Sequence, residues 1–359
     1  MKFSSKWNIR DIFRNKMRTI MGIAGVTGCC MLLVCAFGMF DTMNSFIDIQ
    51  FNDLYNFNYK LTLKNDYTQE QLKEINDKYG DCTSQTLGIE IKNGDAKEAN
   101  TIFVDNSNNY VRFKNHDGDF IKLEDDGVFV TEKLAKTKGY KIGDTISWHV
   151  YGEDKYYESK IVGFDRDAQN QNVKMTKKYL ESLGIEYKPD AVYTNENINM
   201  GTEIDGVEVI QDKNALKEGM TQMIGTMKSM IVLLIVIAAI LGGVIIYNLG
   251  ILSFTEKQYQ FATLRVLGFK NKQIRKIYIE QNNWMAIISI ILGIPLGFYM
   301  TDFIFKMALS DSYDFGAKIE LISYIYAIVG TYVVSFVFSK ILAKKVDKID
   351  MVTSLKGNE

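Results

Sequence analysis

Four long, almost purely apolar segments constrain this 359-residue chain more than any other feature. They cover residues 19–40, 230–252, 284–305 and 321–341. At about 1.5 Å of rise per residue, a helix of this length crosses the roughly 30 Å hydrocarbon core of a bilayer. Because lipid offers no hydrogen-bond partners to the backbone, the pattern predicts a membrane α-helical protein with four transmembrane helices.

A secretory signal peptide is the alternative interpretation of the first apolar segment. The run Thr19–Phe40 is longer than the about 7–15 residues of a signal-peptide core, and no small-residue cleavage motif follows it. Cys35 follows Leu-Leu-Val, so the small residue expected before a lipidated cysteine is missing. We therefore interpret the segment as a retained membrane helix.

Lysine and arginine gather beside the ends of the apolar segments. Residues 1–18, 253–283 and 340–359 together carry a net charge of +11, whereas residues 41–224 carry −11. Basic residues next to membrane spans mark the cytoplasmic side. The charges predict a multi-pass plasma-membrane protein whose termini and 253–283 loop are cytoplasmic and whose large domain is extracytoplasmic. The overall net charge of −1 gives no bulk attraction to nucleic acid.

The polar region between the first two apolar segments mixes strand and helix patterns. Residues 59–63 alternate like a strand, and residues 67–79 have helical character with Thr68 as a predicted N-cap. A short helix is expected after the strand at 127–130. Further short strands are predicted at 87–92, 100–104, 110–113, 145–150, 156–164 and 191–193. The pattern predicts an α+β domain inserted between helices 1 and 2.

The remaining segments complete the predicted order of the chain. An amphipathic cytoplasmic helix precedes the first span, two helical stalks flank the α+β domain, and a cytoplasmic tail follows the last span. The predicted segments besides the four spans are 1–18 (helix), 41–58 (stalk), 59–212 (domain), 213–229 (stalk), 253–283 (cytoplasmic loop), 306–320 (short outer loop) and 342–359 (tail).

The 253–283 loop is basic and amphipathic. Glycine commonly ends or bends a helix, so two helical pieces broken at Leu267–Gly268 are predicted. One interpretation is an interfacial helix that only anchors the loop. The other is a lever, a helix offered to a soluble cytoplasmic partner and joined directly to two membrane helices. Its apolar residues recur at helical spacing on either side of Gly268: Phe261, Leu264, Leu267, Ile274, Ile277 and Tyr278.

Residues of catalytic type are scattered. His116 and His149 have no partner at metal-ligand spacing, and Asp165 and Asp167 are interpreted as solvated loop carboxylates. No G-x-x-x-x-G-K-[ST] motif occurs, so another polypeptide must bind the ATP if ATP drives this protein. We expect no enzymatic activity, no metal site and no cofactor in this chain.

Small residues four positions apart predict close packing between membrane helices. No chain of charges crosses the apolar segments, which argues against an ion-coupled carrier. The small-residue motifs are Gly293/Gly297, which enclose Pro295, Ala238/Gly242, Ala239/Gly243 and Ala24/Gly28.

Further motifs extend over most of the chain. They are Arg10–Lys16, Gly25–Gly28, residues 127–146, Tyr247–Leu249, Glu256, Ala262–Phe269, Gly293–Gly297, Lys348–Val352 and Ser354–Lys356. Together they resemble the FtsX-like, or MacB-type, permeases of ABC transport systems. The first span looks like the start of the second half of larger two-module relatives, so the chain resembles their C-terminal module.

The resemblance implies a permease that acts as a homodimer or beside a second permease half. It also implies a separate cytoplasmic ABC subunit that binds ATP and docks on a coupling helix in the 253–283 loop. In relatives a basic-acidic pair follows the position of Glu256, whereas Tyr259-Gln260 stands here. The implied contact residues are Glu256, Phe261, Ala262, Leu264, Arg265, Leu267 and Gly268.

Two functions follow from the resemblance. In the first, the chain belongs to a transporter of the mechanotransmission type. ATP-driven closure moves the coupling helices, the stalks transmit the movement, and the outer domain grips or releases an extracytoplasmic substrate or protein. In the second, the same movement serves a non-transporting regulator that activates an extracellular cell-wall hydrolase or another partner.

Overall fold

The computed structural model describes residue 10 and residues 16–93, 96–308 and 313–344. The chain divides into two compact units, called here the helical unit and the sheet unit. The helical unit comprises Met1–Thr42, Thr226–Met307 and Gly316–Glu359, and the sheet unit comprises Met43–Gly225 and Ala308–Phe315. Most of the predicted helix at 1–18 and of the predicted tail at 342–359 lies outside the described residues.

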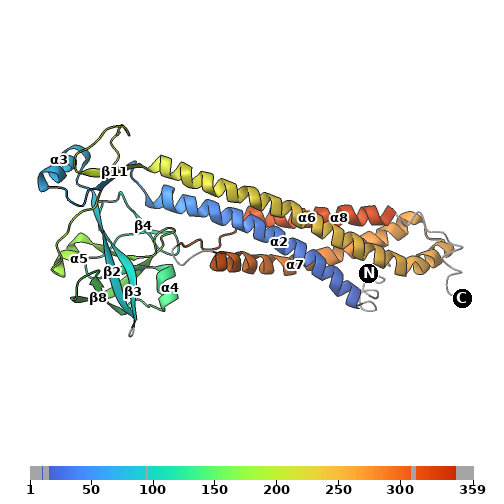
Figure 1. Ribbon diagram of the computed structural model, residues 1–359. Helices are drawn as coiled ribbons and strands as arrows, with labels where there is room; N and C mark the ends of the chain where they lie inside the picture. Colours follow the sequence, from blue (N-terminus) through green and yellow to red (C-terminus); the bar gives the residue numbers. More distant parts are fainter. Residues whose placement is uncertain (1–9, 11–15, 94–95, 309–312, 345–359) are drawn as a thin grey trace. The chain divides into compact units, whose positions relative to one another are not determined.

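Four long helices supply the helical unit. By length and composition, each is long and apolar enough to cross a membrane. The predicted set of four long apolar helices, with a sheet-rich domain between the first and the second, is therefore confirmed for the described residues. Figure 1 shows the helices running beside one another. They are α2 (Lys16–Ile47), α6 (Lys213–Val266), α7 (Asn271–Ala308) and α8 (Leu321–Ala343).

The helices continue beyond the apolar segments. A π-helix, η1 (Asp48–Leu54), follows α2 directly, and α6 is one uninterrupted helix over the predicted stalk, the second span and the first part of the 253–283 loop. Among the described residues after Gly206, Gly268 is the first glycine with a positive φ. Because a left-handed residue is the usual helix stop, α6 has no such stop before Gly268.

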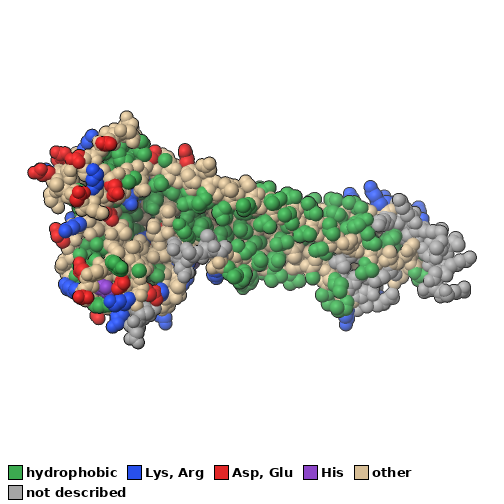
Figure 2. All heavy atoms as spheres, in the orientation of Figure 1, with side chains coloured by type: hydrophobic (Ala, Val, Ile, Leu, Met, Phe, Trp, Pro, Cys, Tyr) green, Lys and Arg blue, Asp and Glu red, His purple; other side chains and the backbone are tan. Residues whose placement is uncertain are grey.

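Apolar side chains are prominent on the surface of the helical unit. Leu233 is 60% exposed and Leu321 is 77% exposed. Figure 2 shows hydrophobic side chains covering the visible face of these helices. In water, such a large apolar surface would promote aggregation. It is therefore suited to contact with lipid or with further apolar helices.

The sheet unit is built on a nine-stranded sheet with the order β11-β1-β10-β2-β3-β9-β6-β8-β7. The separate pair β4 (Phe113–Lys114) and β5 (Phe120–Ile121) lies outside it. The strands of the large sheet are β1 (Tyr59–Leu63), β2 (Thr83–Asn93), β3 (Ala96–Asn106), β6 (Val128–Thr131), β7 (Thr145–Val150), β8 (Tyr156–Asp165), β9 (Val173–Thr176), β10 (Ala191–Thr194) and β11 (Val207–Asp212).

Part of this sheet closes on itself. The pairings run from β2 through β3, β9, β6 and β8 to β7, and β7 also pairs with β2. The inward-facing side chains of these strands form one hydrophobic core around the fully buried Trp148. A second core around Leu61 lies where β1, β10 and β11 pack with α3 (Gln69–Tyr79). Two further short helices, α4 (Glu132–Lys138) and α5 (Lys177–Ser182), complete the unit.

The start of α3 shows how the local sequence determines an element. Thr68 Oγ1 accepts a hydrogen bond from the Gln71 N–H at 3.2 Å, and Gln71 Oε1 accepts one from the Thr68 N–H at 2.7 Å. This capping box satisfies two backbone donors that the helix leaves unpaired. The predicted N-cap is confirmed. In contrast, the strand predicted at 110–113 is wrong, because only Phe113 belongs to a strand, and β9 and β11 were not predicted.

The segment Ala308–Phe315 belongs to the sheet unit. Phe315 stacks on Phe46, with ring centroids 4.4 Å apart. The Asp314 N–H donates to the Ala168 carbonyl at 2.9 Å, and Lys133 Nζ donates to the Tyr313 carbonyl at 2.6 Å. The connection between α7 and α8 is therefore tied to the sheet unit by both stacking and hydrogen bonds.

The interpretation of Asp165 and Asp167 as solvated carboxylates is wrong. Asp165 is 0% exposed and Asp167 is 7% exposed. Lys174 Nζ donates to Asp165 Oδ2 at 2.5 Å and to Asp167 Oδ2 at 2.9 Å. A buried charge is tolerated when it is paired and hydrogen-bonded, so β9 can hold a lysine that is only 3% exposed.

Both histidines lie near a glutamate that is distant in the sequence. His116 Nδ1 is 2.9 Å from Glu132 Oε2, and His149 Nε2 is 2.9 Å from Glu90 Oε2. Neither pair was recognisable from sequence spacing.

Candidate functional site

The turn between α6 and α7 ends α6 with a complete Schellman motif. Gly268 has a φ of +89°. The Phe269 N–H donates to the Leu264 carbonyl at 3.0 Å, and the Gly268 N–H donates to the Arg265 carbonyl at 3.0 Å. These two bonds satisfy carbonyls that the helix end would leave without partners. The predicted break at Leu267–Gly268 is therefore confirmed, and glycine is the residue that adopts this φ without strain.

The next helix begins immediately afterwards. The Lys270 N–H donates to Gln273 Oε1 at 2.9 Å, and the Gln273 N–H donates to the Lys270 carbonyl at 2.8 Å. The glutamine side chain thus provides one half of a capping box at the N-terminus of α7. The two caps leave a connection of only a few residues, so α6 and α7 form a tight helical hairpin.

A hydrophobic core lies beneath this turn. Phe269 packs against it, as is usual for the residue that follows a Schellman glycine. The hydroxyl of Tyr278 donates to the Gly250 carbonyl at 3.3 Å, which joins α7 to α6. The end of α8 contributes to the same core. Its buried members are Phe254, Phe261, Ala262, Leu264, Ile274, Tyr278, Leu342 and Ala343.

Two adjacent apolar side chains remain outside this core. Val266 is 66% exposed and Leu267 is 69% exposed. The neighbouring Lys270, Lys272 and Lys276 are also exposed. The outer surface of the turn, called here the Val266–Leu267 tip, therefore combines an apolar point with surrounding positive charge.

The structure separates the predicted contact residues into two groups. Leu267 and Gly268 are exposed and Arg265 is partly buried, whereas the others with a described side chain are not accessible. The Glu256 side chain lies outside the described residues. Leu267 follows the apolar spacing of a buried stripe, but α6 ends at Val266 and leaves it exposed. The buried members are Phe261, Ala262 and Leu264.

Val266 was not singled out from the sequence. It lies two residues after Leu264, away from the buried stripe, so the helical spacing indicates only that it points outward. It lies at the last residue of α6. The break predicted at Gly268 already indicated this position, whereas the apolar spacing alone did not.

The glycine pair of α7 lies against α2. A Cβ atom on Gly293 would lie 2.6 Å from Cys30 Cβ, and one on Gly297 would lie 2.5 Å from Val34 Cβ. Both distances are shorter than any side chain allows, so only glycine permits this helix approach. Pro295 between them is exposed and α7 continues through it.

The other predicted small-residue motifs differ from one another. A Cβ on Gly242 would overlap Cys29 of α2, whereas one on Gly243 would overlap Phe338 of α8. The two neighbouring glycines thus serve two different helix contacts. Gly28 of α2 faces open space, because a Cβ atom at this position would have no neighbour within 4 Å among the described residues.

The comparisons with known proteins bear on the segment that contains the turn. Residues 232–351 match the family described as FtsX-like permease C-terminal. The match begins inside α6 and includes the turn, α7 and α8. Comparison with curated proteins gives no match. The resemblance drawn from the motifs is confirmed for this segment, which is similar to the C-terminal part of FtsX-like permeases.

Proposed function

We propose that this chain is the membrane subunit of an ABC transporter of the mechanotransmission type. The observation that supports the proposal most directly is the Val266–Leu267 tip. It presents exposed apolar side chains on a rigidly capped turn between two helices that are each long enough to span a membrane. An exposed apolar patch with polar or charged residues around it is typical of a protein contact site.

The charges support one orientation. The basic residues of the turn favour the cytoplasmic side, where a soluble ATP-binding subunit would dock. With four crossings, the sheet unit then lies outside the cell. Figure 2 shows its surface rich in charged side chains, as expected for a domain in water.

The path of the chain supports transmission from the turn to the sheet unit. A single helix, α6, begins in the sheet unit at Lys213 and ends at the tip. Likewise, α2 passes into η1 of the sheet unit, and Ala308–Phe315 joins the sheet unit between α7 and α8. Displacement of the turn by ATP-driven closure of the partner would therefore have one continuous helical route, α6, to the sheet unit.

The docking role is tested by Leu267→Asp and Val266→Asp, each co-expressed with the ATP-binding subunit of the same system. A buried carboxylate at the contact is unfavourable, so we expect recovery of that subunit with the purified permease to fall about tenfold or more. Permease yield and thermal unfolding should not change, because both side chains are outside the hairpin core.

The matched control is Ile142→Asp. Ile142 is 63% exposed in the sheet unit, so this variant adds the same charge at an apolar surface position away from the turn. It should leave partner recovery unchanged. Leu264→Asp is unsuitable, since Leu264 is 4% exposed and its replacement would disrupt the hairpin itself. Undiminished recovery with both tip variants would rule out docking at this turn.

A further inference from the structure

A lysine and an aspartate from two different strands meet on one face of the large sheet. Lys174 of β9 is directly opposite Phe129 of β6, and Phe129 is directly opposite Gly163 of β8. Residues that are opposite on neighbouring strands lie on the same face of a sheet. Asp165 comes two residues after Gly163, so its side chain points to that face as well. Lys174 and Asp165 therefore approach each other across β6.

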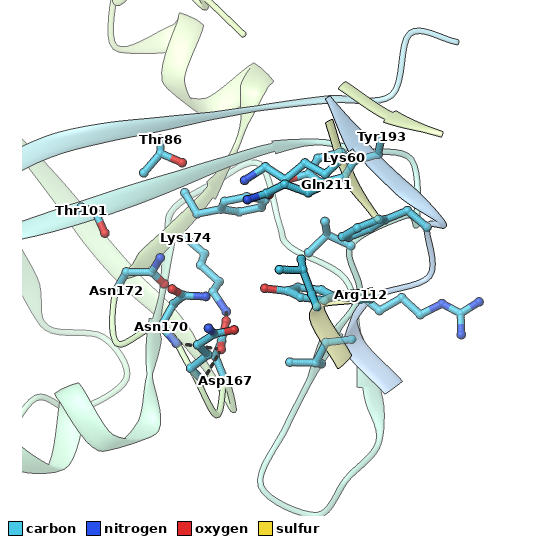
Figure 3. A pocket seen from close by; sticks show the side chains of 17 residues that line it. Lys60, Thr86, Thr101, Arg112, Asp167, Asn170, Asn172, Lys174, Tyr193 and Gln211 are labelled. Carbon is cyan, nitrogen blue, oxygen red and sulfur yellow. Dashed lines mark hydrogen bonds and ion pairs between the residues drawn. The ribbon is translucent and has the colours of Figure 1, made fainter. Parts of the chain in front are cut away.

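The amine of Lys174 is surrounded by two acids and an aromatic ring. Its Nζ atom donates to Asp165 Oδ2 at 2.5 Å and to Asp167 Oδ2 at 2.9 Å. Figure 3 shows the end of the Lys174 side chain at Asp167. The centre of the buried Phe113 ring lies 5.3 Å from Nζ. Lys174 itself is only 3% exposed, so the amine and the acids interact with little competition from water.

The two acids have different surroundings. Asp167 Oδ1 accepts hydrogen bonds from the backbone N–H groups of Gln169 and Asn170, both at 3.0 Å. These bonds hold the other oxygen, Oδ2, on the lysine amine. Asp165 Oδ1, in contrast, has no hydrogen-bond partner among the described residues. Burial raises the pKa of Asp165, which makes it the acid that is suited to carry a proton.

Burial also changes the balance between an ion pair and an amide. In water, the separate ammonium and carboxylate groups are strongly solvated, which favours them over the amide that they could form. A buried carboxylate loses this solvation, and an oxygen without a hydrogen-bond partner makes the loss larger. Groups that are held in contact also react as if they were present at very high concentration. Both effects favour condensation of this pair.

We propose that Lys174 and Asp165 become joined by an amide bond between their side chains, with Asp167 as the base. Asp167 Oδ2 takes one proton from the ammonium group, and the free Nζ attacks Cγ of the protonated Asp165 carboxyl. The Nζ–Cγ bond forms, and the bond from Cγ to the hydroxyl oxygen breaks. A second amine proton leaves with that hydroxyl as water, and the third remains on the amide nitrogen. No oxidant or reductant is needed.

The ion pair is the state of the newly folded protein, and the bond accumulates afterwards. Burial alone would lower the pKa of Lys174, but Asp165 and Asp167 outweigh it and raise that pKa. The free amine is therefore rare, which makes the reaction slow. Lys174 and Asp167 line a cavity of about 350 Å³, which is large enough to accept the released water.

The bond would fix the ends of the loop between β8 and β9. Ala168 in this loop accepts a hydrogen bond from the Asp314 N–H at 2.9 Å. The connection between α7 and α8 is thus bonded to a loop whose two ends become covalently joined. This modification goes beyond the proposed coupling to an ATPase and does not depend on it.

The test is the intact mass of the full-length protein, purified in detergent and measured before and after overnight incubation. We expect the incubated protein to be lighter than its sequence mass by one water. Fragmentation of a tryptic digest should then locate the link in one branched peptide that contains Asp165 and Lys174. Lys178 and Asp125 form an internal control, because their side chains are also 2.9 Å apart but are 80% and 46% exposed. No link should form there.

Two variants separate the roles of the lysine and the base. Lys174→Arg keeps the positive charge but presents a guanidinium group in place of the amine, so it should keep its full mass. Asp167→Asn keeps the side-chain size but cannot take the proton, so the loss of water should be about a hundredfold slower or more. Lys178→Arg is the matched control for the first variant and should lose one water as the parent does.

An incubated parent protein at its full sequence mass would overturn the proposal, whether or not the variants fold. So would a mass deficit that persists in Lys174→Arg, because ring closure at an Asp-Gly pair such as Asp126–Gly127 also releases water. Neither outcome affects docking at the Val266–Leu267 tip, since the coupling test measures recovery of a separate subunit with different variants.

Discussion

At the scale of single residues, Lys174 is a charged side chain that is buried inside the sheet unit. Its ammonium group is buried between the carboxylates of Asp165 and Asp167. It also lies 5.3 Å from the centre of the Phe113 ring. Removing one partner of a buried ion pair leaves uncompensated charge, which costs more than the pair itself contributes.

Lys174→Met should therefore destabilise the protein by about 3–5 kcal/mol. Burial raises the pKa of Asp165, and without Lys174 nothing nearby opposes that effect. A raised folded-state pKa gives stability that is present below the unfolded-state pKa of about 4 and is lost as the pH rises through the folded-state value. The deficit of the variant should thus grow with pH, as measured by thermal unfolding across a pH series.

The triple variant Lys174→Met, Asp165→Asn, Asp167→Asn is the control for this effect. It has no charge left to bury, so it should recover much of the stability and lose the pH dependence. A single variant that unfolds at the parental temperature at neutral pH would show that the group is not buried as described.

At the scale of elements, the contact between α7 and α2 depends on two glycines. Gly297→Ala would place a methyl group 2.5 Å from Val34 Cβ and 3.0 Å from the Met31 carbonyl oxygen. Backbone cannot move aside as a flexible side chain can. The variant should lose about 1–3 kcal/mol through overpacking, measured by thermal unfolding in detergent.

Gly28→Ala is the matched control, because it adds the same methyl group to the other helix of this pair. Gly28 has nothing within 4 Å of the added atom, so alanine should be neutral or slightly stabilising there. Equal effects of the two variants would mean that the helices do not approach closely at Gly297.

At the scale of the whole molecule, the proposed orientation assigns the sheet unit and the α6–α7 turn to opposite sides of the membrane. The lone cysteine of the sheet unit is a poor reporter, since Cys82 is 8% exposed. Ile142→Cys and Lys272→Cys place thiols at exposed positions of the sheet unit and the turn, in a background without the native cysteines.

A membrane-impermeant maleimide should label Ile142→Cys in intact cells. It should label Lys272→Cys only after the membrane is opened, because the basic turn is expected to be cytoplasmic. Labelling of both positions from the same side would contradict the proposal that an ATP-binding subunit acts on the turn while the sheet unit responds on the opposite side of the membrane.

The sequence by itself determined the elements whose cause is local. Continuous apolar runs predict long helices because the backbone must hydrogen-bond within itself in lipid. Thr68 and Gly268 predict a helix start and a helix end because a hydroxyl acceptor and a left-handed glycine act on adjacent backbone groups. The family resemblance likewise follows from short motifs that can be recognised in the sequence alone.

Only the tertiary structure decided what depends on residues distant in the chain. From the sequence alone, Lys174 of β9 would be expected to face solvent. The fold instead buries it, and its ammonium group donates hydrogen bonds to Asp165 and Asp167. Leu264 and Leu267 both fit the helical apolar spacing of the 253–283 loop. In the structure Leu264 is buried beneath the turn, whereas Leu267 is exposed on its surface. Lys174 of β9 lies opposite Phe103 of β3. This register is set by pairing across the sheet rather than by local composition.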